Sequence, residues 1–86
     1  GAWPAVAKHF TPDAAGNVTR GDVIVEQGGQ NIVFGERGHL VTLLGVRDLV
    51  VVQTADATLV MPKSRAQDIK ALLARVASHP RAAKLL

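Results

Sequence analysis

The side chains that could bind a metal or move a proton are few and are spread along the chain. The three histidines, at positions 9, 39 and 79, fall on three different expected elements. A catalytic metal needs several ligands brought to one point, and this spacing does not supply them. The chain has no cysteine, which excludes a thiolate metal site, a disulfide and a cysteine nucleophile. We therefore interpret His9, His39 and His79 as solvated or hydrogen-bonded residues and expect no metal site.

Four aspartates could supply paired carboxylates for acid–base chemistry: Asp13, Asp22, Asp48 and Asp56. Each falls in an expected turn or at a corner between strands. Aspartate is common at such positions because its side chain accepts hydrogen bonds from nearby backbone N–H groups. We interpret all four as turn-forming residues.

Nucleophiles and phosphate-binding loops are also missing from the sequence pattern. Gly28-Gly29 lies between strands and precedes no helix, so it cannot direct helix N–H groups at a phosphate. Ser64 is better explained as a helix cap and Ser78 as a helix-end residue. The residues alone predict a structural or interaction module with no catalytic residue, cofactor or metal of its own.

The N-terminal segment is predicted to form a short helix over residues 3–10. Trp3, Val6, Ala7 and Phe10 follow i, i+3, i+4, i+7 spacing and would form one apolar stripe. The turn-forming residues 11–17 predict a loop after it.

The middle of the chain is predicted to be β-rich, because Val, Ile, Thr and Leu dominate and glycines divide them into short runs. Expected strands cover residues 23–27, 31–35, 39–46, 49–54 and 57–61. The runs within 39–46 and 49–54 are apolar at consecutive positions, which predicts burial on both faces.

A weak six-residue rhythm joins Phe34, Leu40, Val46 and Val52. Such a period is typical of a left-handed parallel β-helix, in which each flat side takes about six residues. Strand alternation alone can produce the same spacing. An antiparallel meander with a hairpin turn at 36–38 fits equally well, so periodicity leaves both folds open.

The C-terminal segment is predicted to be an amphipathic helix over residues 65–78. Ser64 and Gln67 have the spacing of a capping box, and Pro80 would end the helix. Its apolar stripe consists of Ile69, Leu72, Leu73 and Val76. The chain then ends on Leu85 and Leu86, which is unusual for a free tail.

The composition bounds the remaining possibilities. The 86 residues are 48% hydrophobic with a net charge of +3, which suits one small domain. There is no transmembrane run or secretory signal, so we expect a cytoplasmic location and no membrane partner. A small basic β-domain that binds nucleic acid is the alternative function. It is disfavoured because the basic residues are scattered and only three residues are aromatic.

Several stretches, in order, carry a resemblance to a known family. They are GAW at 1–3, GNV at 16–18, GDV at 21–23, GVRDLVVVQTADATLV at 45–60 and KSRAQDIKALL at 63–73. The sequence resembles the C-terminal region of bacterial mannose-1-phosphate guanylyltransferases, which make GDP-mannose and pyrophosphate from GTP and mannose 1-phosphate. The segment from 45 to 73 is the specific part of this resemblance.

The resemblance implies a mainly β domain: a short left-handed parallel β-helix with a short N-terminal helix and a C-terminal amphipathic helix. It divides the chain into the end of a nucleotidyltransferase domain or a linker helix (1–15), the β-helix (16–63) and a helix with a tail (64–86). It places the active site and its Mg²⁺ in the parent enzyme, outside this chain.

The resemblance also implies partners, namely the parent catalytic domain and further copies of the chain, and a non-catalytic role in oligomerisation. Residues expected at such interfaces are Trp3, Phe10, Leu72, Leu73, Val76, Leu85 and Leu86.

Overall fold

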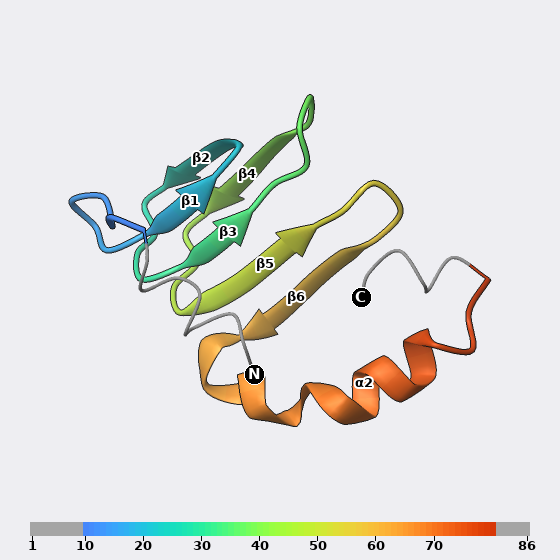
Figure 1. Cartoon of the computed structure of the whole chain (residues 1–86). Helices are drawn as coiled ribbons and strands as arrows, with labels where there is room; N and C mark the ends of the chain where they lie inside the picture. The colour runs from blue at the N-terminus through green and yellow to red at the C-terminus, as the bar shows by residue number, and fades with distance from the viewer. Residues whose placement is uncertain (1–9, 81–86) are drawn as a thin grey trace.

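The computed structural model describes residues 10–80, which form six strands, a 3₁₀ segment and one α-helix (Figure 1). The strands are β1 (Val18–Arg20), β2 (Asp22–Glu26), β3 (Ile32–Phe34), β4 (Leu40–Leu44), β5 (Leu49–Gln53) and β6 (Thr58–Pro62). The 3₁₀ segment η1 (Lys63–Asp68) leads into α2 (Ile69–Val76). The helix predicted for residues 3–10 lies almost wholly outside the described residues.

The strands form a coil in which each turn stacks on the previous one in parallel. Sheet A has the order β1-β3-β5-β6, and sheet B consists of β2 and β4. Asp22 pairs with Leu40 and Ile32 with Val50, so these turns take eighteen residues. The bridge between Gly29 and Arg47 has the same offset and lies on the third side. The first turn is shorter, because Val18 pairs with Ile32 after fourteen residues.

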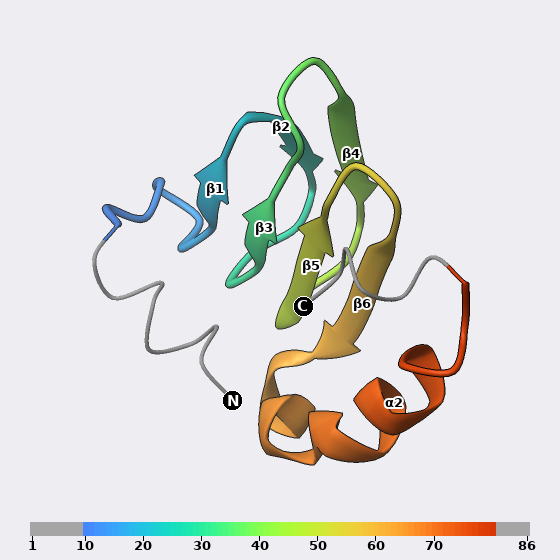
Figure 2. The same ribbon diagram turned by 45° about the vertical axis from the view of Figure 1, so that its right-hand side comes forward.

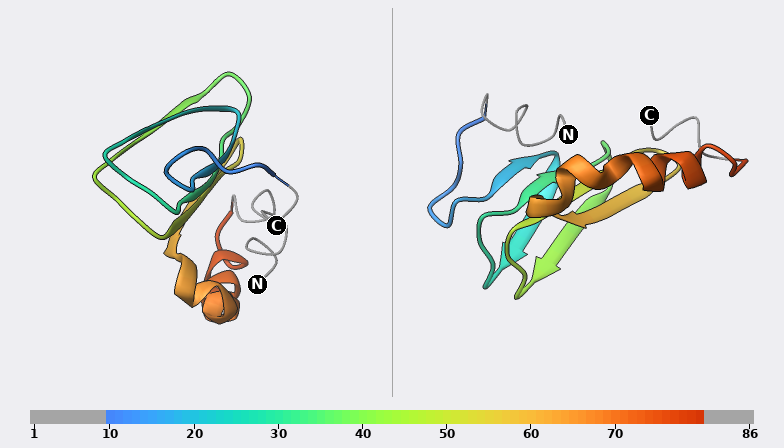
Figure 3. Two further views of the ribbon diagram at one scale, coloured as in Figure 1. Left: turned by 90° about the vertical axis from the view of Figure 1, so that its left-hand side faces the viewer. Right: turned by 90° about the horizontal axis from the view of Figure 1, so that it is seen from below.

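The coil is left-handed. In the left view of Figure 3, the chain passes from β1 to β2 and round to β3 counter-clockwise while it moves away from the viewer. The β-helix expected from the resemblance is therefore confirmed, and eighteen residues are three six-residue sides. The meander is wrong at residues 36–38, because β3 and β4 belong to different sheets. Among the strands of residues 10–80, only β5 and β6 pair antiparallel.

The corners of the coil repeat with the same offset. Gln27 and Gly45, one turn apart, both have positive φ, at 55° and 69°. Gln30 and Asp48 form the next corner with φ of 57° and 58°. A left-handed backbone conformation turns the chain sharply between two flat sides, and glycine adopts it without the steric cost that other residues bear.

Sheet A is buried on both faces at its centre, over β3 and the middle of β5. One face carries Ile32, Phe34, Val50 and Val52, which pack in a cluster that also includes Ala66 of η1. The opposite face carries Val33 and Val51, which pair with each other and are 0% and 4% exposed. Figure 2 shows η1 and α2 beside sheet A at the end that β6 occupies. The apolar runs of β3 and β5 are thus explained by burial on two sides, as predicted for residues 49–54.

Sheet B contradicts the same prediction for residues 39–46. Along β4, half-buried Val41 and Leu43 alternate with exposed Leu40 and Leu44. Val41 lies near Gly35, inside the coil, so the exposed leucines are on the outer face. No described element covers that face. The consecutive apolar residues within 39–46 therefore predicted an element that covers the outer face of β4, and none of the described elements does so.

The C-terminal helix starts later than predicted and has no capping box. Pro62 precedes η1, no side chain caps either helical segment, and Ser64 lies within the first turn. The backbone N–H of Lys63 donates to Asp48 O at 2.7 Å, which fixes the start of η1 one residue before Ser64. The strand β1 was also missed, because Val18–Arg20 is short and mostly polar.

Candidate functional site

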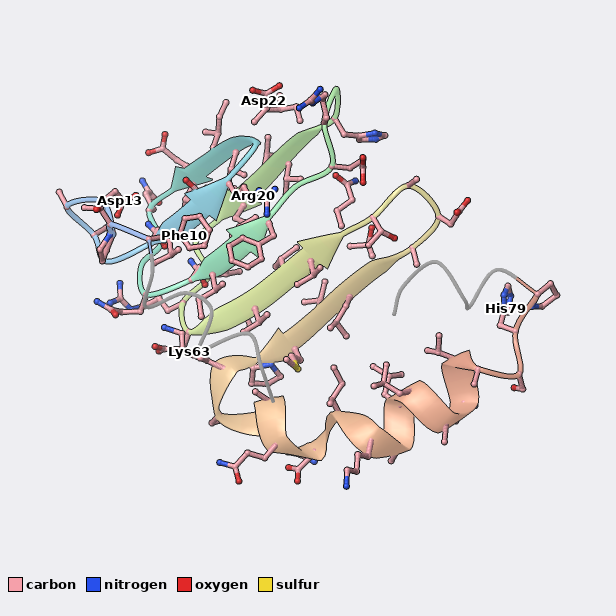
Figure 4. The ribbon with its side chains drawn as sticks, viewed as in Figure 1. Phe10, Asp13, Arg20, Asp22, Lys63 and His79 are labelled. Atoms are coloured by element: carbon pink, nitrogen blue, oxygen red, sulfur yellow. The ribbon has the colours of Figure 1, made fainter. Side chains whose placement is uncertain are left out.

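The chemically capable side chains do not converge. Asp22 starts β2 and His79 follows α2, so these two lie on separate parts of the fold (Figure 4). His39 directly precedes Leu40, the β4 residue that pairs with Asp22, so His39 and Asp22 lie near each other at one end of sheet B. Among residues 10–80, no three His, Asp or Glu side chains group as metal ligands. His9 lies outside the described residues. Within the same range, no helix is long and apolar enough to cross a membrane.

The predicted turn role is confirmed for two aspartates. The Asp13 carboxylate accepts hydrogen bonds from the backbone N–H groups of Ala15 and Asn17, both at 2.9 Å. The Asn17 backbone bond in particular lowers the pKa of Asp13 below its ordinary value. Asp48 forms a corner with positive φ. Asp22 differs, because it is the first residue of β2.

Two buried asparagines form a polar ladder that the sequence reasoning missed. Asn31 is 0% exposed and Asn17 is 2% exposed. The Asn17 side-chain oxygen accepts from the Asn31 backbone N–H at 3.0 Å and from the Asn31 side-chain amide at 3.1 Å. Asn31 in turn accepts from the Leu49 N–H at 2.9 Å. The ladder ties three successive turns of the coil together.

A signal for this ladder was present in the sequence. Each asparagine directly precedes an apolar strand residue, Val18 or Ile32, at the start of one side of the coil. Buried polar side chains are kept only where they are hydrogen-bonded. The role of the ladder is structural, since the side chain of each asparagine is hydrogen-bonded to the backbone or to the other asparagine.

A hollow of about 820 Å³ lies at the corner between the two sheets. Its charged lining is mixed in sign, with Arg20 and Arg37 beside Asp22 and Glu36. The backbone N–H of Glu36 donates to Gln53 Oε1 at 3.3 Å. Because this hollow brings two positive and two negative groups together, its charges favour neither an anionic nor a cationic ligand.

The amphipathic helix α2 is the clearest surface that could bind a partner. None of its eight residues is buried. Leu72 is 42% exposed, and Leu73 and Val76 are half-buried. Ile69, the first residue of α2, packs against the core cluster. Three of the predicted interface residues therefore lie on one partly uncovered stripe.

Phe10 has a contact within the chain. Its ring centroid lies 5.5 Å from that of Phe34, and it packs against the core cluster of sheet A. Figure 4 shows Phe10 over this sheet. The other predicted interface residues, Trp3, Leu85 and Leu86, lie outside the described range.

The outer face of sheet B is a second apolar surface. Ile24 is 54% exposed, Leu40 57% and Leu44 72%. They share this face with Asp22 and Glu26, at either end of β2. Exposed aliphatic side chains gathered on one sheet are typical of an interaction site.

The sequence matches the family described as "MannoseP isomerase/GMP-like beta-helix domain" over residues 21–76, from the start of β2 to the end of α2. The chain belongs to this family. The match covers both sheets apart from β1, together with the C-terminal helix.

Relatives and a solved structure agree with this assignment. The chain is 43% identical over 70 residues to the alginate biosynthesis protein AlgA of Pseudomonas aeruginosa. It is 40% identical over 81 residues to a mannose-1-phosphate guanylyltransferase of Escherichia coli. These matches cover 81% and 94% of this chain but only 14% and 17% of the relatives.

The fold is shared with a crystal structure from Thermus thermophilus, described as a mannose-1-phosphate geranyltransferase. The TM-score is 0.76 at 31% identity, over 88% of this chain and 23% of that one. The resemblance to the C-terminal region of mannose-1-phosphate guanylyltransferases is thus confirmed. The chain corresponds to a small part of those longer proteins.

Proposed function

We propose that this chain is a non-catalytic assembly domain of an enzyme that resembles mannose-1-phosphate guanylyltransferase. Its role would be to hold the catalytic domain and to join subunits. The observation that carries the proposal is the amphipathic helix α2, whose apolar stripe is left partly exposed. A helix with one apolar face is stable when that face is covered.

The surrounding body suits a supporting role. Among residues 10–80, the buried residues are almost all aliphatic, and the two buried polar side chains, Asn17 and Asn31, are hydrogen-bonded within the asparagine ladder. Binding of GTP, mannose 1-phosphate and Mg²⁺ would belong to the remainder of the longer enzyme. The described residues offer no cluster of carboxylates for Mg²⁺, which takes oxygen ligands.

The test of assembly is sedimentation equilibrium of the chain over a wide concentration range. The proposal predicts self-association that weakens in Leu72→Asp, because the new carboxylate would be desolvated in the contact. Ala71→Asp is the matched control, since Ala71 is exposed and lies on the opposite side of α2 from the stripe. A monomer at every concentration, or equal effects of both variants, would contradict the use of this stripe.

The test of catalysis is separate. The chain is mixed with GTP, mannose 1-phosphate and Mg²⁺, and pyrophosphate is measured. The proposal predicts no release above the rate without protein. Turnover by the chain alone would refute the non-catalytic assignment.

A further inference from the structure

The free edge of β4 presents backbone groups that lack a strand partner. Gly45 N–H donates to Glu26 O of β2 at 2.8 Å, so the backbone of Gly45 points toward β2. Backbone groups alternate sides along a strand, and Val41 and Leu43 therefore also point toward β2. The N–H and C=O groups of Leu40, Thr42 and Leu44 point the other way, to the edge that no described strand covers.

This edge differs from the other sheet edges of the described chain. The edge strand β1 has only three residues and ends in Arg20, β2 carries Asp22 and Glu26, and β6 ends in Pro62. Short length, charge and proline all discourage the addition of another strand. The sequence of β4, LVTLL, has none of these protections.

The space beside β4 is bordered by sheet A. With an eighteen-residue turn, a third coil would place residue 58 beside Leu40, but residues 58–62 instead form β6 in sheet A. Val60 pairs with Val51 and so lies on the interior face of that sheet, yet it is 59% exposed. Leu43, inside sheet B, is half-buried. Sheet A thus extends past β4 and leaves a niche where the next strand of sheet B would lie.

We propose that one extended segment from the remainder of the longer enzyme adds to the edge of β4 and fills this niche. The segment would be uncharged over about five residues, the length of β4, with apolar side chains at alternate positions that cover Val60 and Leu43. This inference rests on the proposed function and names the contact through which the domain holds its catalytic partner.

Two observations favour this occupant. The chain spans only 14% to 17% of the relatives named above, so most of the longer polypeptide is available to supply a strand. A second copy fits less well. Antiparallel pairing of two β4 strands about a two-fold axis would bring the β5–β6 hairpin of each copy into the body of the other, because that hairpin extends beyond β4.

The test is residue-resolved amide hydrogen exchange on this chain and on the longer polypeptide that joins it to a guanylyltransferase-like catalytic region. We expect the Leu40, Thr42 and Leu44 amides to exchange at least ~100-fold more slowly in the longer polypeptide, as paired strand amides do. The Val41 and Leu43 amides bond to β2 in both proteins and serve as internal controls.

A pair of variants of the longer polypeptide tests the same contact. Thr42→Pro removes the edge-directed N–H and is tolerated on a free edge, whereas Thr42→Val keeps that N–H. We expect Thr42→Pro, and not Thr42→Val, to restore fast exchange at Leu40 and Leu44. If Thr42→Pro does not fold, the exchange rates of the unsubstituted longer polypeptide decide whether a strand adds to the edge of β4.

The outcomes separate this inference from the proposed function. Protection of α2 amides in the longer polypeptide, with Leu40, Thr42 and Leu44 still fast, would overturn the strand addition and leave the assembly role intact. Protection of these three amides in the isolated chain that rises with concentration would identify a second copy and overturn the occupant proposed here. No protection on either surface would overturn both proposals.

Discussion

The asparagine ladder gives the sharpest prediction about stability, through the substitution Asn31→Leu. Leucine is close to asparagine in shape but has no polar atom. The substitution removes three side-chain bonds: from Leu49 N–H at 2.9 Å, to Val46 O at 3.0 Å and to Asn17 Oδ1 at 3.1 Å. Because Asn31 is 0% exposed, water cannot replace these partners without opening the coil.

The expected cost follows from the groups that lose a bond. Leu49 N–H loses its partner, at about 1–3 kcal/mol. Val46 O keeps a bond from Gly29 N–H, and Asn17 Oδ1 keeps one from the backbone N–H of residue 31, so each loses one of two bonds, at about 0.5–1.5 kcal/mol apiece. Burial of the leucine side chain offsets about 1–2 kcal/mol. The net loss is about 3 kcal/mol, against a total of roughly 4–13 kcal/mol for a chain of this length. At about 4–8 °C per kcal/mol, Tm would fall by about 12–24 °C.

The assay is urea unfolding followed by far-UV circular dichroism, with thermal melting as a second measure. Gln53→Leu is the control, because it makes the same change of amide to leucine at a half-buried residue whose side chain accepts one bond, from Glu36 N–H. We expect the control to cost less than about 1 kcal/mol. A loss for Asn31→Leu no larger than that of the control would refute the reasoning.

Three further predictions concern local features. Gly45→Ala is expected to cost about 1 kcal/mol in urea unfolding from its φ of 69° alone, since no atom lies within 4 Å of the added carbon. Asp13 has a depressed pKa in the folded chain, so its contribution to stability is present above its unfolded value of about 3.9 and is lost as pH falls through the folded value. Asp13→Asn should therefore weaken the pH dependence of Tm in this acid range. A Tm that falls with decreasing pH as steeply as in the unsubstituted chain would contradict this prediction. Arg65 and Asp68 form an ion pair of 2.6 Å with side chains that are 66% and 59% exposed. Because the pair is screened by solvent, Arg65→Ala should change the free energy of unfolding by less than about 1 kcal/mol. A larger loss in urea unfolding would show that this pair is not solvent-screened.

Local pattern predicted most strands well. Five of the six strands lie where runs of branched aliphatic residues were bounded by glycine or turn-forming residues. The strand Val18–Arg20 was missed because its pairing with β3 is what makes it a strand. Ser64 and Gln67 have the spacing of a capping box, but Lys63 is held by Asp48, which directly precedes the neighbouring strand β5. A long-range bond set the start of that helical segment.

The candidate surface was predicted only in part. The stripe on α2 follows from helical spacing, which is local, and the structure leaves Leu72 exposed as an interface would require. The exposed face of β4 could not be predicted. Its sequence is as apolar as that of buried β5, and only the position of other elements distinguishes the two strands.

The sequence by itself determined that this chain forms short strands separated by tight corners, followed by an amphipathic helix. Those features depend on side-chain branching and on the spacing of neighbours a few residues apart. The tertiary structure alone decided which residues of successive turns meet: Asn17 with Asn31, fourteen residues apart, and Ile32 with Val50, eighteen residues apart. It also decided that β6 pairs with β5, which leaves the edge of β4 uncovered. Stacking of successive turns is a long-range event, and its register depends on corner geometry and burial summed over the whole coil.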